Sequence, residues 1–337
     1  MGKLVRNLVI MGSTGSVGTQ ALDVVRAFPD ELRVVALVAG TNFEVLQQQI
    51  VEFKPKWIDS NCTSEQKLKL YSYGCIEKPI EEIVTLPEVD LVVTATSGDI
   101  ALVPTLIAIN HKKNIALANK ESIVLSGVEL VSKAKENSVN IFPLDSEPNA
   151  IWQCLRGEEK EISKLIITAS GGALRDFTMD ELSFVTPKQA LNHPTWKMGD
   201  KITVDSATLM NKAFEVIEAH YLFDIPWEDI EVILHPESLI HSMVEFVDGS
   251  IKAQISKPDM RMPIQYSLLY PLRKSNPGLS KLDLIEIGKL SFNRLDLNRY
   301  PCFVLGLEYG RRGDTWPAVL SGADEMAVEL FLSGKLN

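Results

Sequence analysis

Two acidic residues stand close together in a pattern typical of a cation site. Asp145 and Glu147 belong to the segment Asp145-Ser146-Glu147-Pro148, which directly follows an apolar run ending at Leu144. Pro148 biases the residue before it towards an extended backbone, in which residues two apart point to the same side. Two carboxylates presented together at a strand end could bind Mg²⁺ or Mn²⁺, which prefer oxygen ligands. A solvated acidic turn is the equally simple alternative.

A third carboxylate lies on a predicted helix farther along the chain. Ser206 is a suitable N-cap, and residues 206–223 carry apolar side chains at helical spacing. Asn211, Glu215 and Glu218 fall on one face of that helix. If this face meets the strand end after residue 144, Glu215 would complete an all-oxygen metal site. A polar surface face would show the same spacing.

Two further segments are suited to an anion such as a phosphate. Residues 168–172 (TASGG) follow an apolar run, and their backbone amides and hydroxyls could surround an anion. Asn211 and Lys212, with Ser206, add a donor, a positive charge and a helix dipole. Lys120 follows another apolar run and would point into the same crevice. Ordinary turns and a surface lysine are the alternatives.

A glycine-rich turn near the N-terminus indicates a dinucleotide site. Gly12, Gly15 and Gly18 lie in residues 12–18 (GSTGSVG), between a short apolar run and a stretch of helical spacing. Such glycines allow a tight turn and a close approach to a pyrophosphate at a helix N-terminus. The spacing differs from the better-known G-x-G-x-x-G, so the strand–turn–helix context carries the prediction. A glycine turn without a ligand is the alternative.

The residues after the second predicted strand bear on the choice between NAD and NADP. A carboxylate there would bind the ribose 2′-hydroxyl. The segment Ala39-Gly40-Thr41-Asn42 brings no carboxylate before Glu44, and it also lacks an Arg or Lys. The segment therefore permits a 2′-phosphate but contains no cation to hold one.

These residues need a scaffold, and the first third of the chain alternates short apolar runs with helical spacing. Short apolar runs suit strands that are buried on both faces of a parallel sheet. A strand, a helix and a second strand in succession form a βαβ unit, and the series predicts a doubly wound sheet. The predicted strands lie at residues 8–11, 34–38, 91–94 and 115–118, and the first helix at 20–28.

The pattern changes after residue 144. Two extended runs flank Asp248-Gly249, which is a strong hairpin signal. Residues 171–204 are rich in Gly, Pro and polar residues, which predicts a long irregular segment, either a functional loop or a disordered one. The extended runs of this half lie at residues 165–168, 239–247 and 250–256.

Composition excludes several classes of protein. The 337 residues include 34 basic and 44 acidic ones, so a net charge of −10 opposes a nucleic-acid or anionic-membrane partner. Four dispersed cysteines favour a reducing, cytoplasmic compartment. No targeting segment is evident, and the most apolar stretch, residues 91–109, is interrupted by Gly98, Asp99 and Pro104. We therefore expect a bacterial-type cytoplasmic protein.

Several longer segments, taken together, resemble the 1-deoxy-D-xylulose 5-phosphate reductoisomerase family. They occur in order over nearly the whole chain, which leaves little room for coincidence. The segments are residues 12–18, 117–122 (LANKES), 144–147 (LDSE), 169–172 (ASGG), 193–199 (HPTWKMG), 204–212 (VDSATLMNK) with Glu215, 235–244 (HPESLIHSMV) and 258–261 (PDMR).

The resemblance implies an α/β fold and an enzyme. The expected parts are a Rossmann-like NADP domain (1–144), an α+β catalytic domain with a mainly antiparallel sheet (145–272), a linker (273–298) and a partial C-terminal helical domain (299–337), which looks truncated. The implied substrate is a ketose phosphate, which is isomerised and then reduced with NADPH to 2-C-methyl-D-erythritol 4-phosphate in non-mevalonate isoprenoid synthesis. Mg²⁺ or Mn²⁺, with Co²⁺ as a further candidate, is the implied metal, and a homodimer is expected.

The resemblance also implies roles for individual residues. The metal ligands would be Asp145, Glu147 and Glu215, and the catalytic residues Lys120, Glu147, His193 and His241. Substrate contacts would come from Ser146, Ser170, His193, Trp196, Ser206, Asn211, Lys212 and Glu215, with Trp196 and Met198 on a flexible flap. The cofactor would contact Gly12, Ser13, Thr14, Gly15, Ser16, Val17, Gly40, Asn42, Asn119, Glu121 and Gly199.

Two departures from the family pattern bear on binding. Many members carry a basic residue near Thr41, so the strictness of the NADP preference stays open here. Many also have a His where this chain has Pro148, which bears on substrate affinity.

Two alternative functions would need a different set of residues. Another NADP-dependent reductase, such as a semialdehyde dehydrogenase, needs an acyl-accepting cysteine, and Cys154 lies in an apolar, helical setting. A non-catalytic dinucleotide sensor would need neither three carboxylates nor Lys212 and the Trp196 flap.

Overall fold

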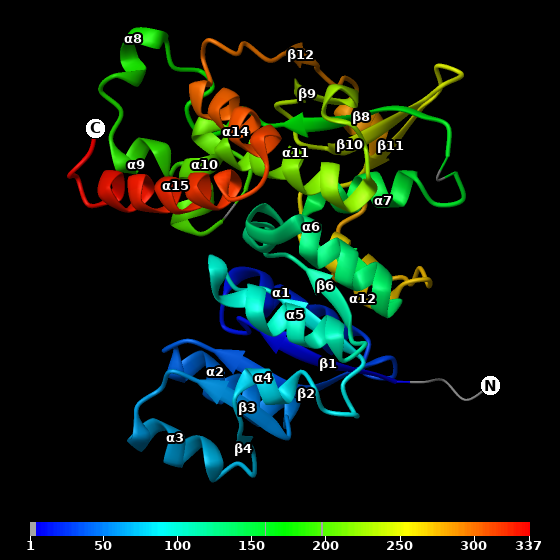
Figure 1. Ribbon diagram of the computed structural model, residues 1–337, viewed down its shortest axis with the longest axis vertical. Helices are drawn as coiled ribbons and strands as arrows, with labels where there is room; N and C mark the ends of the chain where they lie inside the picture. Colours follow the sequence, from blue (N-terminus) through cyan, green and yellow to red (C-terminus); the bar gives the residue numbers. More distant parts are fainter. Residues whose placement is uncertain (1–4, 159, 197) are drawn as a thin grey trace. The chain divides into compact units, whose positions relative to one another are not determined.

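The computed structural model describes residues 5–158, 160–196 and 198–337, and these divide into two compact units. The first unit contains residues 1–122, 128–145 and 259–279, and the second contains residues 123–127, 146–258 and 280–337 (Figure 1). The predicted domains (1–144, 145–272, 273–298 and 299–337) describe functional parts of the chain and stay a prediction beside these two compact units.

The first unit is built on a parallel sheet of seven strands in the order β4-β3-β2-β1-β5-β6-β7. Each paired segment is parallel, as short apolar runs buried on both faces require. The chain reverses its direction of travel across the sheet between β1 and β5, so a ligand crevice is expected at the carboxyl ends of these two strands. The strands are β1 (Arg6–Met11), β2 (Leu32–Ala39), β3 (Trp57–Ser60), β4 (Ile76–Glu77), β5 (Leu91–Thr94), β6 (Asn114–Leu117) and β7 (Ile141–Pro143).

Helices connect these strands, and the predicted doubly wound pattern is confirmed. The helix α6 bends at Ser126, whose backbone is not helical. The helices are α1 (Ser16–Ala27), α2 (Phe43–Phe53), α3 (Ser64–Tyr71), α4 (Ile80–Ile83), α5 (Leu102–Asn110), α6 (Lys120–Asn137) and α12 (Arg261–Leu269), with the 3₁₀ turn η1 (Asp99–Ala101).

The second unit has a five-stranded sheet in the order β11-β10-β8-β9-β12. Only β8 and β9 pair in parallel, so the sheet is mainly antiparallel, as expected. The predicted hairpin is confirmed as β10 and β11. The strands are β8 (Ile162–Ala169), β9 (Ile230–Leu234), β10 (Ile240–Phe246), β11 (Ile251–Ile255) and β12 (Asn293–Arg294).

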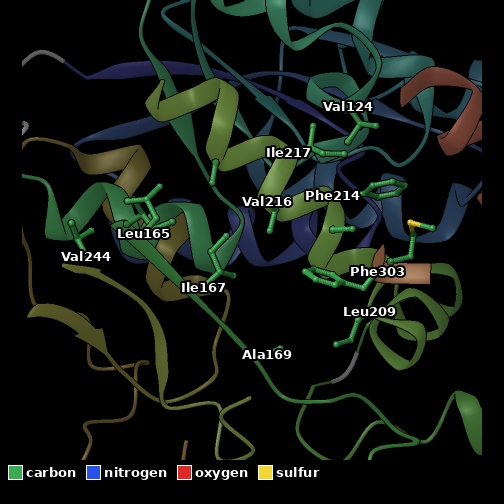
Figure 2. Packing of buried hydrophobic residues seen from close by; sticks show 14 of the residues in the cluster. Val124, Leu165, Ile167, Ala169, Leu209, Phe214, Val216, Ile217, Val244 and Phe303 are labelled. Carbon is green, nitrogen blue, oxygen red and sulfur yellow. The ribbon is translucent and has the colours of Figure 1, made fainter. Parts of the chain in front are cut away.

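The helix α11 (Met210–Phe223) packs on this sheet and carries the core of the second unit. Phe214 and Ile217 are fully buried in a cluster that also contains Ile167 of β8 and Phe303 of α14 (Figure 2). The other helices of the unit are α7 (Ser146–Cys154), α8 (Met179–Leu182), α9 (Pro187–Ala190), α10 (Asp200–Thr208), α13 (Leu284–Ile287), α14 (Pro301–Arg312) and α15 (Trp316–Leu332), with the 3₁₀ turn η2 (Trp227–Asp229).

Three local predictions are wrong. Glu147 is not extended, because Ser146 begins α7, and Pro148 lies in the first helical turn, where its missing N–H costs nothing. Ser206 is not an N-cap but lies inside α10, which Leu209, with φ of 58°, separates from α11. The segment 171–204 is not wholly irregular, since it includes α8, α9 and the start of α10.

Among the described residues, no helix combines the length and apolar character that a membrane span requires.

Candidate active site

The glycine turn lies tightly against the carboxyl ends of two strands. Gly12 has φ of +75°, and a Cβ there would lie 2.5 Å from the carbonyl oxygen of Ala95. A Cβ on Gly18 would lie 2.1 Å from the carbonyl oxygen of Gly12. The amides of Gly12 and Ser13 donate to Val38 at 2.9 and 3.0 Å. Only glycine permits this path, which leads the chain directly into α1.

The N-terminus of α1 is available to an anion. Gly15 is the N-cap and no side chain caps the helix, while its first turn contains no acidic residue. The first amides of a helix need a partner, and a pyrophosphate is a suitable one. Thr14 and Val17 are partly buried, and Gly15 and Ser16 are exposed. The turn therefore fits the dinucleotide that its sequence predicts.

A buried glutamine supports this turn. Gln49 of α2 is buried, and its Nε2 donates to the carbonyl oxygen of Ser13 at 2.8 Å. Ser13 itself is fully buried, and its hydroxyl has no partner among the described residues. Sequence reasoning missed Gln49, because nothing in the pattern of α2 distinguishes it from a surface residue.

The other predicted cofactor residues lie at strand ends and helix starts. Gly40 follows β2 and is exposed, and Asn42 caps α2 by accepting from the amide of Val45 at 3.4 Å. Asn119 caps α6, and its Nδ2 donates to the carbonyl oxygens of Thr96 and Gly98 at 2.8 and 2.9 Å. Asn119 thus fixes the loop after β5.

The remaining two predicted cofactor residues fall in different units. Glu121 lies in the first turn of α6 and is partly buried. Gly199 belongs to the second unit, where it is the exposed N-cap of α10.

The three predicted carboxylates do come together. Asp145, Glu147 and Glu215 each offer an oxygen, and these atoms lie within 4.8 Å of one another. Their side chains are 12%, 16% and 1% exposed, so this is not a solvated acidic turn. An all-oxygen, largely dehydrated carboxylate set suits Mg²⁺ or Mn²⁺. The donor set therefore fits the metal.

Two lysines balance part of this negative charge. Lys120 Nζ lies 2.5 Å from Asp145 Oδ2, and Lys212 Nζ lies 2.6 Å from both Glu147 Oε1 and Glu215 Oε2. Burial lowers the pKa of Lys212, but the two glutamates outweigh it and raise the pKa above its usual value. Lys212 is therefore an ammonium ion at neutral pH.

Two neighbours orient the glutamates. The Nδ2 of Asn211 donates to Glu215 Oε1 at 2.6 Å, and the hydroxyl of Ser146 donates to Glu147 Oε2 at 2.6 Å. Asn211 and Glu215 thus lie together on α11, as their spacing predicts, and Lys212 of the same helix also contacts Glu215.

A second polar group forms at the end of β8. His193 Nδ1 accepts from the amides of Thr195 and Trp196 at 3.1 and 2.9 Å, so the proton is on Nε2. That Nε2–H donates to the Ser170 hydroxyl at 3.1 Å, which also accepts from the Gly172 amide at 3.1 Å. The Ser170 hydroxyl proton is not used in either of these bonds, so it can be donated to a further acceptor such as a phosphate oxygen.

The charge around His193 favours an anion. Burial, then the positive charges of Arg175 and Lys212, lower the pKa of His193 to about 4. His193 is therefore neutral at pH 7 and acts as a hydrogen-bond donor. Sequence reasoning missed Arg175, whose position three residues after Gly171-Gly172 was the available signal.

Ser206 lies against the same loop. A Cβ on Gly172 would lie 2.4 Å from the carbonyl oxygen of Ser206, so the loop and α10 are in close contact. Ser206 is buried in the last turn of α10 and does not lie at a helix N-terminus.

His241 lies beneath the predicted flap. Its ring centroid is 6.0 Å from that of Trp196, and its Nε2 lies 3.0 Å from the Ser256 hydroxyl. Burial lowers the pKa of His241, although the charge of Glu147 opposes that effect. Met198 of the flap is partly buried, and Lys197 lies outside the described residues.

Cys154 does not support the rival reductase chemistry. It belongs to the apolar core of the second unit, and burial raises the pKa of its thiol to about 11. A protonated core thiol is a poor nucleophile.

A glycine turn at the switch point of a parallel sheet, a carboxylate cation site and an anion-binding loop define a metal-assisted, dinucleotide-dependent oxidoreductase. Profiles of one family match three parts of the chain. The profile described as "1-deoxy-D-xylulose 5-phosphate reductoisomerase" matches residues 8–127. The profile of the "1-deoxy-D-xylulose 5-phosphate reductoisomerase C-terminal domain" matches residues 141–223, and that of the "DXP reductoisomerase C-terminal domain" matches residues 255–337. The chain belongs to the 1-deoxy-D-xylulose 5-phosphate reductoisomerase family.

Individual relatives agree over nearly the whole length. The chain is 48% identical to the reductoisomerase of Shouchella clausii, with 98% of this chain and 89% of the relative covered. It is 49% identical to that of Bacillus subtilis, with 98% and 88% covered.

Solved structures agree as well. A reductoisomerase in complex with NADPH, fosmidomycin and magnesium has a TM-score of 0.94 and 38% identity, with 98% of this chain and 86% of that chain covered. The enzyme of Zymomonas mobilis in complex with NADPH has a TM-score of 0.90 and 37% identity, with 99% and 88% covered. The family and fold predicted from the sequence are confirmed.

Proposed function

We propose that this chain converts 1-deoxy-D-xylulose 5-phosphate into 2-C-methyl-D-erythritol 4-phosphate with NADPH and a divalent metal, a step of non-mevalonate isoprenoid synthesis. One observation carries the proposal: Asn211, Lys212 and Glu215 of α11 join a buried carboxylate cluster, in a family whose solved structures include complexes with NADPH and magnesium. The reaction breaks and reforms one carbon–carbon bond, by retro-aldol and aldol steps, and then reduces the resulting aldehyde to an alcohol.

The bound metal, with Asp145, Glu147 and Glu215 as its ligands, would polarise the substrate oxygens, and the nicotinamide would supply the hydride. Mn²⁺ or Co²⁺ could replace Mg²⁺ on this oxygen set. Lys120 holds a proton at Nζ beside Asp145 and is suited to return one to a substrate oxygen. Each proton taken from a substrate hydroxyl must be returned before the product leaves, and the hydride needs one further proton.

The phosphate end of the substrate would meet a set of donors. His193, neutral and protonated on Nε2, fixes the Ser170 hydroxyl, and Ser206 lies against the same loop. Asn211 and Lys212 connect this end to the carboxylates. The Trp196 ring beside His241 would exclude water once substrate binds.

The test is an assay of NADPH oxidation with the ketose phosphate in the presence and absence of Mg²⁺. We expect NADPH to be oxidised only when the ketose phosphate and Mg²⁺ are both present. No oxidation by folded, Mg²⁺-loaded protein that binds NADPH would refute the proposal.

We also propose a homodimer and a cytoplasmic location. The edge strand β11 exposes Ile251 and Ile255, which would be covered in a dimer formed along that edge. For the location, the four cysteines of the chain form no disulfide, as suits a reducing compartment. Sedimentation of the parent chain and of an Ile255→Lys variant tests the dimer: a monomeric parent would refute it.

A further inference from the structure

The two serines proposed to bind the phosphate, Ser170 and Ser206, lie on two segments of the second unit, here called walls, and both walls are supported from the C-terminal part of the chain. The first wall is the loop of residues 170–175 after β8. The Tyr300 hydroxyl donates to the Gly171 carbonyl oxygen at 3.3 Å. Arg299 Nη2 donates to the carbonyl oxygens of Leu174 and Arg175 at 2.6 and 3.2 Å. Three carbonyl oxygens of the loop, those of Gly171, Leu174 and Arg175, therefore accept hydrogen bonds from residues 299–300.

Arg175 extends this support to the serine. Its Nη1 donates to the carbonyl oxygens of Ser170 and Pro236 at 3.1 and 3.2 Å. Arg299 donates to the Arg175 backbone, and the Arg175 side chain donates to the Ser170 backbone. Arg299 therefore supports the position of Ser170 indirectly, through Arg175. Tyr300 is buried, so its hydroxyl cannot exchange this partner for water at low cost.

The second wall is α10, which carries Ser206. Lys201 Nζ of this helix lies 2.5 Å from Asp205 of the same helix and 2.6 Å from Asp324 of α15. The two aspartate side chains are 3% and 9% exposed. Lys201 also lies 5.1 Å from the ring centroid of Phe214. Val204 packs beside Val328 of α15, so a buried ionic contact and an apolar contact both join α15 to α10.

The two walls are in close contact at Gly172 and Ser206. A Cβ on Gly172 would lie 2.4 Å from the Ser206 carbonyl oxygen, so neither wall can move towards the other. A movement of either wall away from this contact would separate Ser170 from Ser206.

We infer that Tyr300 and Asp324 are positioning residues, which set the distance between the two phosphate-binding walls without touching the substrate. The inference rests on the proposed function, because it assigns Ser170 and Ser206 to the substrate phosphate. Loosening either wall should weaken phosphate binding. NADPH binding should be unchanged when the loop after β8 is loosened, since the glycine turn belongs to the other unit, whereas α10 begins at the predicted cofactor residue Gly199.

The experiment compares Tyr300→Phe and Asp324→Asn with two matched controls. Tyr309→Phe is the control for Tyr300→Phe. Tyr309 lies on α14, of which Tyr300 is the N-cap, and its hydroxyl has no hydrogen-bond partner among the described residues. Glu325→Gln makes the same charge change one residue away at an exposed position. The probes are the ketose phosphate as substrate and inorganic phosphate as a competitive inhibitor.

We expect each test variant to raise the KM for the ketose phosphate and the Ki of inorganic phosphate about three- to tenfold, the loss of one buried hydrogen bond. The kcat of both variants, and the KM for NADPH of Tyr300→Phe, should stay within about twofold of the parent values, and the controls should match the parent. Should Asp324→Asn not fold, Tyr300→Phe, which loses a single hydroxyl, provides the same measurement.

An unchanged Ki for phosphate in the folded test variants, or an equal rise in both KM values of Tyr300→Phe, would overturn the inference. A parent protein that does not turn over the ketose phosphate would instead refute the proposed function, so the two failures are distinguishable.

Discussion

Replacing Glu215 by Gln removes one charge from the carboxylate cluster and changes its shape very little. The parent cluster has three carboxylates against two ammonium groups, a net charge of −1, and the variant has two of each, a net charge of 0. Glu215 is 1% exposed, so water cannot replace the lost oxygen charge. Lys212 keeps Glu147 as its partner, which limits the loss of stability.

The magnitude follows from the role of a direct ligand. Loss of an outer-sphere partner costs about 10–100-fold in metal affinity, and loss of a charged ligand should cost at least about 100-fold. We therefore expect the Mg²⁺ concentration for half-maximal activity to rise at least about 100-fold, and turnover at fixed Mg²⁺ to collapse. NADPH affinity should be nearly unchanged, because the glycine turn lies in the other unit.

The assay is a titration of NADPH oxidation with Mg²⁺, together with NADPH binding followed by fluorescence. Glu228→Gln is the matched control, since it makes the same change at an exposed position just beyond α11. Parent-like Mg²⁺ dependence in a folded Glu215→Gln protein would refute the assignment of this residue as a ligand.

Two further predictions concern the cofactor turn and the phosphate pocket. Gly12→Ala places a Cβ 2.5 Å from the Ala95 carbonyl oxygen, and it should raise the KM for NADPH at least about tenfold; an unchanged KM would contradict the turn's role. The pKa of His193 is about 4 in the native state, below its usual 6.5. Between these two pH values the imidazole is protonated in unfolded chains and neutral in native ones. Stability should fall as the pH drops from about 6.5 to about 4, by about 1–2 kcal/mol after solvent screening. Urea unfolding should show this fall reduced in His193→Gln, and an equal fall in both proteins would exclude His193.

The sequence was sufficient for features that depend on local pattern. Buried strands such as β1 and β5 are short apolar runs, and the alternation of strands with helices determines the doubly wound sheet. The hairpin of β10 and β11 follows from Asp248-Gly249 in the same way.

Features that depend on tertiary contacts were harder to predict from the sequence. The spacing of Asp145 and Glu147 allowed either a metal site or an acidic turn, and only the packing of α11 brings Glu215 to them. Ser206 was misplaced as an N-cap because the break at Leu209 depends on one left-handed residue that composition does not reveal. The predicted extended backbone at Glu147 failed because a proline is equally acceptable in the first turn of a helix.

Several supporting residues had no sequence signal at all. Gln49 holds the glycine turn and Tyr300 holds the phosphate loop, yet each contact joins residues far apart in the chain. Residues of this kind are visible only once the fold places them beside their partners.

The central claim is that this chain reduces a ketose phosphate with NADPH in a metal-dependent reaction. The most direct measurement follows NADPH absorbance with 1-deoxy-D-xylulose 5-phosphate, first after metal removal with EDTA and then after addition of excess Mg²⁺ or Mn²⁺. We predict no oxidation without metal and full recovery with it. Oxidation that continues in EDTA, or none after Mg²⁺ or Mn²⁺ is restored to folded protein, would contradict the account.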